Sequence, residues 1–248
     1  QGNGSIEAAS VKYDAASFTI DANSDGKVKR VGYEFLGWAL DKDAKDPVYS
    51  AESENLAVSD VKAFFGTTNP ADVTLYAVWA PINYTVVFVK NADDVTGEME
   101  DLKVEFDKSF TLPENEYHRT GYQFTGWSTN ASAGTNDIKY ADKAEITTNL
   151  LTKAEKVYFY AQWEALPYTI TFDVQGGNGT FDGIDTTFDS EVVLPTVVTR
   201  EGYQFQGWTK NGSTSFFSTD ATISLPTGSN LSLTAVYRPL TDSERREQ

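Results

Sequence analysis

The clearest chemical pattern lies in the oxygen-bearing side chains of the segment DANSDGKVKRVGYEF, which begins at Asp21. Asp21, Asn23 and Asp25, followed by Gly26, match the opening of a calcium loop, where alternate side chains supply oxygen ligands and a glycine allows the turn. The twelfth position is Gly32, whereas such loops need a bidentate glutamate there. Asp, Asn, Ser and Gly are also the usual residues of turns. The pattern favours a plain loop, with a calcium site as the alternative, and indicates no other cofactor.

Residues suited to acid-base or nucleophilic catalysis are scarce. His118 is the single histidine, in the polar stretch EYHRTG, and the chain has no cysteine. The usual catalytic triads therefore lack a base, and thiolate chemistry is excluded. Carboxylates are plentiful, but no acidic pair recurs at equivalent places along the chain. We expect a chain that is not an enzyme.

Three tryptophans recur in a way that could serve binding. The heptads GYEFLGW, GYQFTGW and GYQFQGW end in Trp38, Trp127 and Trp208. Strict strand alternation puts Tyr203 and Phe205 on one face and Trp208 on the other. The favoured interpretation is that each indole covers a small core or packs on a neighbouring module. The alternative is a partly exposed ring on which a sugar or a peptide stacks.

The elements that position these residues repeat three times. Each heptad is followed by a closing signature, LYAVW at 75–79, FYAQW at 159–163 and LTAVY at 233–237. Trp79 is a candidate to fill the gap that the second heptad glycine leaves in a strand face. Opening strands are predicted at 84–89 and at 168–174, where Tyr168, Ile170, Phe172 and Val174 share the buried face.

The first repeat departs from this order. Its opening residues QGNGS align with the turn QGGNGT at 175–180, which follows the opening strand of the third repeat. The strand itself is missing, so we expect it to lie upstream, or else the first repeat has an edge that could accept a strand from another chain. We predict repeats at 1–81, 82–166 and 167–240, and a polar tail at 241–248.

Segments between and within the repeats add detail. The joints at 80–83 and 164–167 are short, and each contains a proline. The spacing between heptad and closing signature varies, which is typical of a surface loop. In the first repeat this loop contains SDVKAFFG at 59–66, which predicts one short helix.

Charge limits the partners. Acidic residues outnumber basic ones by 36 to 20, giving a net charge of −16. This charge repels phosphate backbones and anionic lipid, so we expect no nucleic-acid partner and no membrane insertion. No stretch is long and apolar enough to span a bilayer. Because secreted proteins of many bacteria also lack cysteine, its absence does not indicate the cytosol.

Taken in order, the opening strand, the GY-x-F-x-GW heptad and the YA-x-W signature resemble tandem Listeria-Bacteroides repeats, the family that includes the internalin B-repeat. The resemblance covers residues 1 to about 240. It implies a mainly β chain, α+β at most, built as a linear array of three small β-grasp-like modules. It also implies an extracellular segment of a secreted or cell-surface bacterial protein.

Three functions are compatible with that resemblance. The first is a non-catalytic spacer or stalk, whose partners are the neighbouring domains of the parent protein. The second is an adhesion module that binds a host or environmental glycan or protein through an exposed Trp38, Trp127 or Trp208. The third is an accessory segment of a secreted polysaccharide-degrading enzyme.

Overall fold

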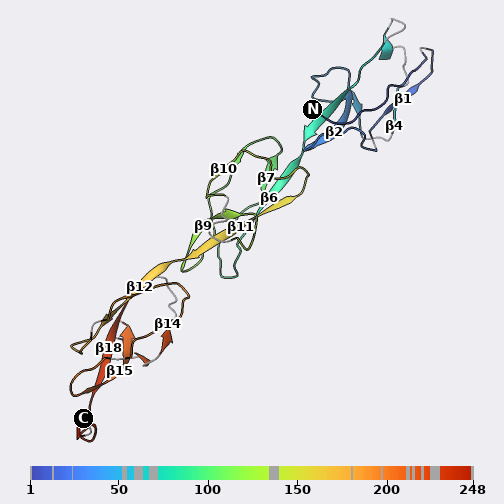
Figure 1. The fold of residues 1–248 in the computed structure, drawn as a ribbon. Coiled ribbons are helices and arrows are strands. Elements are labelled where there is room, and N and C mark those ends of the chain that lie inside the picture. The colour runs from blue at the N-terminus through green and yellow to red at the C-terminus, as the bar shows by residue number, and fades with distance from the viewer. Residues whose placement is uncertain are drawn as a thin grey trace. The chain divides into compact units, whose positions relative to one another are not determined.

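The protein is described from a computed structural model, shown in Figure 1. It describes the whole chain except residues 1, 13, 24, 52–54, 59–63, 67–71, 134–139, 180, 197, 211–212, 214–215, 219–220, 224–229 and 247–248. The fold is almost entirely β, which confirms the fold class predicted from the sequence.

Two compact units divide the chain. Unit 1 comprises Gln1–Phe88, Glu100–Pro113 and Lys143–Phe159, and unit 2 comprises Val89–Met99, Glu114–Asp142 and Tyr160–Gln248. The division runs through the middle repeat. Each joint between consecutive repeats therefore lies inside a single unit.

The strands of unit 1 come from the first repeat and part of the second. They are β1 (Phe18–Asp21), β2 (Tyr33–Ala39), β3 (Tyr49–Ser50), β4 (Asn55–Val58), β5 (Tyr76–Pro81), β6 (Asn83–Val89, all but its last residue), β7 (Leu102–Glu105), β8 (Phe110–Thr111), β10 (Glu145–Ile146) and the first part of β11 (Lys156–Ala165).

Unit 2 holds the rest of β11 and the whole third repeat. Its other strands are β9 (Tyr122–Ser128), β12 (Pro167–Asp173), β13 (Ile184–Thr187), β14 (Val192–Val193), β15 (Tyr203–Lys210), β16 (Phe216–Ser218), β17 (Thr222–Ile223) and β18 (Leu231–Pro239), followed by a 3-10 turn at Glu244–Arg246.

The third repeat is described most completely. Its sheet has the order β13-β12-β18-β15-β16, in which the first and last long strands, β12 and β18, are parallel neighbours. This central parallel pair with antiparallel flanks is the arrangement of a β-grasp-like module. The antiparallel ribbon β14-β17 contributes Val192 and Ile223 to the core, on which the sheet also packs.

The predicted alternation of β12 is confirmed. Tyr168 and Ile170 are buried, and Phe172 and Val174 pack against the same core. Since successive side chains of a strand point to opposite faces, these four residues cover one side of the sheet.

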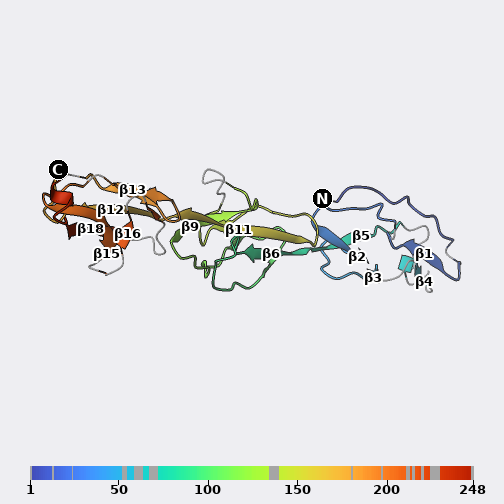
Figure 2. The ribbon, with the colours of Figure 1, turned by 90° about the horizontal axis from the view of Figure 1, so that it is seen from below.

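The first repeat has a smaller sheet, with the order β3-β2-β5, and a separate ribbon of β1 and β4 (Figure 2). No strand among the described residues occupies the second edge of β5. The short helix predicted at 59–66 falls mostly outside the described residues. Within it, Phe64 and Phe65 are helical, and Phe64 packs edge-on against Phe18 with ring centroids 5.0 Å apart.

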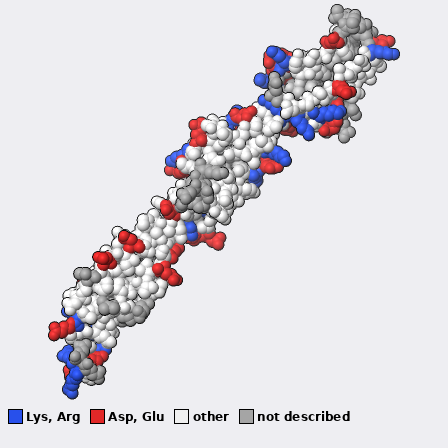
Figure 3. Space-filling model, viewed as in Figure 1, with Lys and Arg blue, Asp and Glu red and all other residues white. Residues whose placement is uncertain are grey.

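Charged side chains of both signs are interspersed over the face shown in Figure 3. They form no continuous basic patch on that face, in agreement with the low ratio of basic to acidic residues. Among the described residues, no helix has the length and hydropathy needed to cross a bilayer.

Candidate functional site

A β-bulge in each heptad changes the face of its tryptophan. The register between β15 and β18 shifts between Phe205 and Gly207, so Gln206 is the extra residue. A bulge restarts the alternation. Phe205 and Trp208 consequently lie on the same face, with ring centroids 5.4 Å apart. The prediction from strict alternation, that Trp208 faces away from Phe205, is wrong.

The recurring tryptophans are core residues in this structure. Trp127 and Trp208 have no exposed surface, and Trp38 is 8% exposed. The indole nitrogen of Trp38 donates to the carbonyl of Asp21 at 2.7 Å, and that of Trp208 donates to the carbonyl of Pro195 at 2.8 Å. Stacking a ligand needs an open ring face, and none of these rings offers one as it is placed here.

The closing aromatics cover the opening turns. Trp79 packs edge-on against Phe35, with ring centroids 5.4 Å apart, and a Cβ atom on Gly2 would lie 3.3 Å from its ring. The space beside the second heptad glycine, Gly37, is filled by the backbone of β3 at Tyr49. The expectation that Trp79 fills this space is therefore wrong.

The Asp21 loop is held together by a lysine. The ammonium of Lys27 lies 3.2 Å from Asp21 and 3.0 Å from Asp25. The hydrogen bond with Lys27 lowers the pKa of Asp25. Asn23 donates to the carbonyl of Val28 at 2.9 Å and accepts from its amide at 2.8 Å. The side chains considered for calcium thus contact a cation and backbone supplied by the chain itself.

The remaining candidates for chemistry are His118 and the acidic side chains. His118 forms a β-bridge with Thr96 through its backbone. No group of three His, Asp or Glu side chains in the described part of the chain is arranged to hold a metal. A shallow depression beside Phe35 and Pro47 is an open surface.

The joint between the first two repeats, inside unit 1, is held by ring packing and by side-chain hydrogen bonds. Phe106 lies over Gly32, where a Cβ atom would overlap its ring, and Phe106 itself is only 8% exposed. Next to it, the hydroxyl of Tyr33 donates to Asp107 at 2.8 Å, and Asn149 donates to the other oxygen of Asp107 at 2.7 Å. The hydrogen bond from Tyr33 lowers the pKa of Asp107 and in turn raises the pKa of Tyr33.

Backbone and stacking contacts complete this joint. The amide of Ile82 donates to Gly32 at 3.0 Å, and the carbonyl of Ile82 accepts from Phe106 at 2.9 Å. The guanidinium of Arg30 lies 3.5 Å from the centre of the Tyr33 ring. A glycine is required at position 32, because φ is 76° and the ring leaves no room for a side chain.

The joint between the second and third repeats, inside unit 2, is built in the same way. Phe188 lies over Gly121, and the hydroxyl of Tyr122 donates to Asp189 at 3.1 Å. The amide of Leu166 donates to Gly121, and its carbonyl accepts from Phe188, both at 2.9 Å. One set of contacts thus links consecutive repeats twice.

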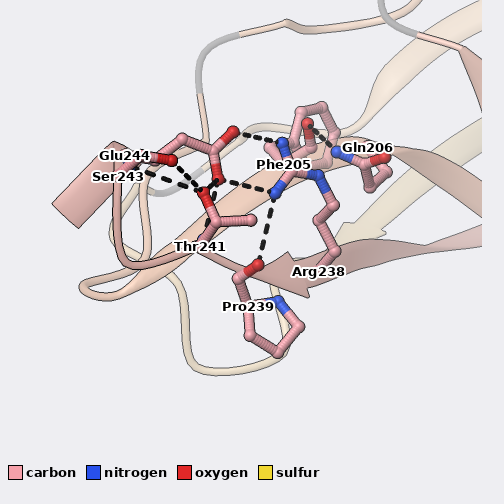
Figure 4. Close-up of polar contacts among 7 residues, drawn as sticks. All are labelled: Phe205, Gln206, Arg238, Pro239, Thr241, Ser243 and Glu244. Carbon is pink, nitrogen blue, oxygen red and sulfur yellow. Dashed lines mark hydrogen bonds and ion pairs between the residues drawn. The ribbon is translucent and has the colours of Figure 1, made fainter.

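The third heptad has the same residues but a different neighbour. Gly202 has a φ of 74°, and no atom would come within 4 Å of a Cβ placed there. Tyr203 is 38% exposed, although Arg200 still lies 4.4 Å from its ring centre. After Leu240 the chain forms the 3-10 turn, where Glu244 accepts from Arg238 at 2.6 and 2.9 Å and from the Thr241 hydroxyl at 2.8 Å (Figure 4).

The contacts at these joints were not predicted from the sequence. The partners lie 74 residues apart for Tyr33 and Asp107, and 67 apart for Tyr122 and Asp189. The available signal was the dipeptide Phe-Asp at 106–107 and 188–189, since Phe106 and Phe188 lie 15 and 14 residues before the heptad glycines Gly121 and Gly202.

Comparison with known families is consistent with this repeated construction. The family model of the Listeria-Bacteroides repeat domain matches residues 1–78, 84–162 and 168–236. The chain belongs to this family. The resemblance inferred from the heptads and closing signatures is thereby confirmed.

Relatives of this Listeria-Bacteroides repeat chain are longer proteins. A protein of Evansella cellulosilytica, named as a Gly-rich membrane protein, is 27% identical over 184 residues, 74% of this chain and 20% of the relative. A second protein of that organism, named as a membrane protein, is 26% identical over 83% of this chain and 26% of its own length. Internalin H of Listeria monocytogenes is 34% identical over 159 residues, 62% of this chain and 25% of the relative. The chain thus spans about a quarter or less of these relatives.

Proposed function

We propose that this chain is a non-catalytic spacer segment of a bacterial protein exposed at the cell surface or secreted. Its partners in this role are the neighbouring domains of the parent protein. The observation that carries the proposal is the pair of joints, in which a phenylalanine packs on a heptad glycine and a tyrosine binds the following aspartate. A spacer needs fixed connections between modules more than it needs a cleft.

Several observations support a structural role over ligand binding. The recurring indoles are buried, and the oxygen ligands of the Asp21 loop contact Lys27. The relatives are far longer than the region they share with this chain, as expected for a segment that connects other domains. The names of these relatives, two membrane proteins and an internalin, support a location outside the cytoplasm.

The spacer proposal is tested by measuring how tightly one repeat is fixed on the next. Because the chain has no cysteine, Val48→Cys and Lys103→Cys would carry two spin labels at unique positions within unit 1. We expect a narrow distance distribution for the otherwise unchanged chain, and a broader one when Phe106→Ala removes the ring from the joint. A broad distribution in the unchanged chain would contradict a fixed connection.

The adhesion alternative has a separate test. The purified chain is screened against a glycan array and mucin, with and without calcium. The spacer role predicts no specific binding in either condition. Reproducible binding that is lost in a folded Trp38→Phe, Trp127→Phe or Trp208→Phe variant would instead assign a ligand contact to that position.

A further inference from the structure

The sheet of the second repeat has an outer face whose side chains the core does not use. In unit 1 the strands β7, β6 and the first part of β11 lie side by side (Figure 1). Tyr84 and Val86 of β6 are buried, with exposed fractions of 2% and 0%. Because successive side chains of a strand alternate between faces, Thr85 and Val87 point to the opposite, outer face.

The register of the three strands brings two lysines onto this outer face. Thr85 lies opposite Lys103 of β7. On its other side, the amide of Thr85 donates to the carbonyl of Glu155 at 3.0 Å, which in a parallel ladder places Thr85 beside Lys156. Adjacent strands are about 4.8 Å apart, so the backbones of the two lysines are separated by about 10 Å.

An aromatic ring lies next to these lysines. Tyr158 follows Lys156 by two residues and therefore shares its face, beside Val87. Tyr158 is 44% exposed, whereas the next residue, Phe159, is completely buried. The side chain of Lys156 is 57% exposed, and Lys103 is exposed as well. The face thus presents an accessible phenol ring within reach of two ammonium groups.

The third repeat has small or acidic polar residues at all four equivalent positions. They are Asp185, Asn230, Thr171 and Ser232, in place of Lys103, Lys156, Val87 and Tyr158. There the hydroxyl of Thr169 donates to Asp185 at 2.7 Å, and its amide donates to the Asn230 side chain at 2.9 Å. Since the third repeat forms the same sheet without them, the fold does not require the lysines and the tyrosine of the second.

The charge of this face is opposite in sign to that of the whole chain, which is −16. Lys156 lies 3.7 Å from Asp101, and Glu105 lies 2.9 Å from Lys108. Together with Lys103, these groups comprise three ammonium and two carboxylate groups. A local surplus of positive charge attracts an anionic ligand.

We propose that the outer face of this sheet binds a carboxylate-bearing polysaccharide. The binding residues are Lys103, Lys156, Val87 and Tyr158. The apolar C–H face of a sugar ring packs on an exposed aromatic ring, and ammonium groups bind carboxylates through charge-assisted hydrogen bonds. An open sheet face suits an extended sugar chain, whereas peptides bind mainly along strand edges or in grooves. The inference goes beyond the spacer role, since a connecting segment needs no ligand, and its failure would leave the joints as described.

The test titrates the complete chain with oligogalacturonate and follows the backbone amides of Thr85, Lys103 and Tyr158 by NMR. We expect saturable shifts at these amides that weaken as salt is added. Tyr158→Ser and Lys103→Gln should each raise the dissociation constant by about threefold or more. Poly-L-glutamate, which carries carboxylates without sugar rings, should bind more weakly by at least about the same factor.

Two variants elsewhere in unit 1 serve as matched controls. Tyr76→Thr removes another exposed tyrosine, which is 39% exposed, and Lys42→Gln removes one positive charge from a side chain that is 72% exposed. Neither should change the dissociation constant.

The outcomes decide for or against the site. Loss of binding confined to the Tyr158 and Lys103 variants, with the rest of their spectra unchanged, supports it. The absence of shifts at the three amides would overturn it. Equally tight binding of poly-L-glutamate, or equal losses in the control variants, would also overturn it, because charge attraction alone would then explain the binding.

Discussion

Replacing the heptad glycines one at a time would measure what the joints contribute. Gly121→Ala places a methyl group where the ring of Phe188 lies, whereas Gly202→Ala places one in open space. The two glycines have nearly the same φ, 77° and 74°. Both substitutions therefore carry the same cost of a left-handed alanine, about 1–2 kcal/mol. Their difference isolates the contact with Phe188.

The size of that difference follows from the burial of the ring. Phe188 is 9% exposed and also packs edge-on against Tyr122, at 5.4 Å between centroids. Complete removal of such a ring costs about 3–5 kcal/mol. A methyl group at Gly121 displaces the ring from one side only, so we expect roughly half of this, about 2 kcal/mol beyond the Gly202→Ala value.

Amide hydrogen exchange measures the local stability of the joint. The Leu166 amide donates to Gly121, and the Leu240 amide donates to Gly202. Gly121→Ala is expected to accelerate exchange of the Leu166 amide, and Gly202→Ala that of the Leu240 amide. An extra 2 kcal/mol makes the first acceleration roughly 30-fold larger than the second. Equal acceleration in the two variants would show that the phenylalanine contributes nothing, and would refute the account of the joint.

Three further predictions concern polar contacts. Tyr33→Phe removes the hydrogen bond to the joint aspartate and is expected to lower the urea midpoint of unfolding measurably. Tyr203→Phe should leave the urea midpoint unchanged, and equal changes in the two variants would contradict this. Hydrogen bonds from Arg238 keep the pKa of Glu244 below its ordinary value of 4.5, so the turn keeps its full stability above that pH and loses it as the pH falls further. An NMR titration midpoint of the Glu244 carboxyl at 4.5 would oppose that assignment. Added calcium should leave the thermal midpoint unchanged, because Lys27 already bridges both loop carboxylates, and a rise that EDTA reverses would indicate a metal site after all.

Strand positions could be predicted from the sequence because they depend on local alternation. The buried face of β12 was correctly predicted from the spacing of Tyr168, Ile170 and Phe172. The face of Trp208 was not, because one bulged residue reverses the alternation and nothing in the local pattern requires it. The third closing residue, Tyr237, still covers its opening turn by donating to Val174 at 2.8 Å.

The contacts at the joints could not be predicted from the sequence, for a different reason. A glycine with positive φ is explained locally by a turn, so nothing in the heptad demands a ring above Gly32. The requirement becomes visible only when Phe106 is brought from the next repeat. The loop at Asp21 is similar, since a calcium ligand set and a lysine-bridged turn share the same acidic residues, and only the position of Lys27 distinguishes them.

The parallel pairing of β12 with β18 has a mechanical consequence. The chain enters the third repeat along β12 and leaves it along β18, and the two strands are hydrogen-bonded side by side in the same direction. Tension applied to the ends of the repeat pulls these strands past each other, so their ladder bonds share the load in shear instead of opening one after another.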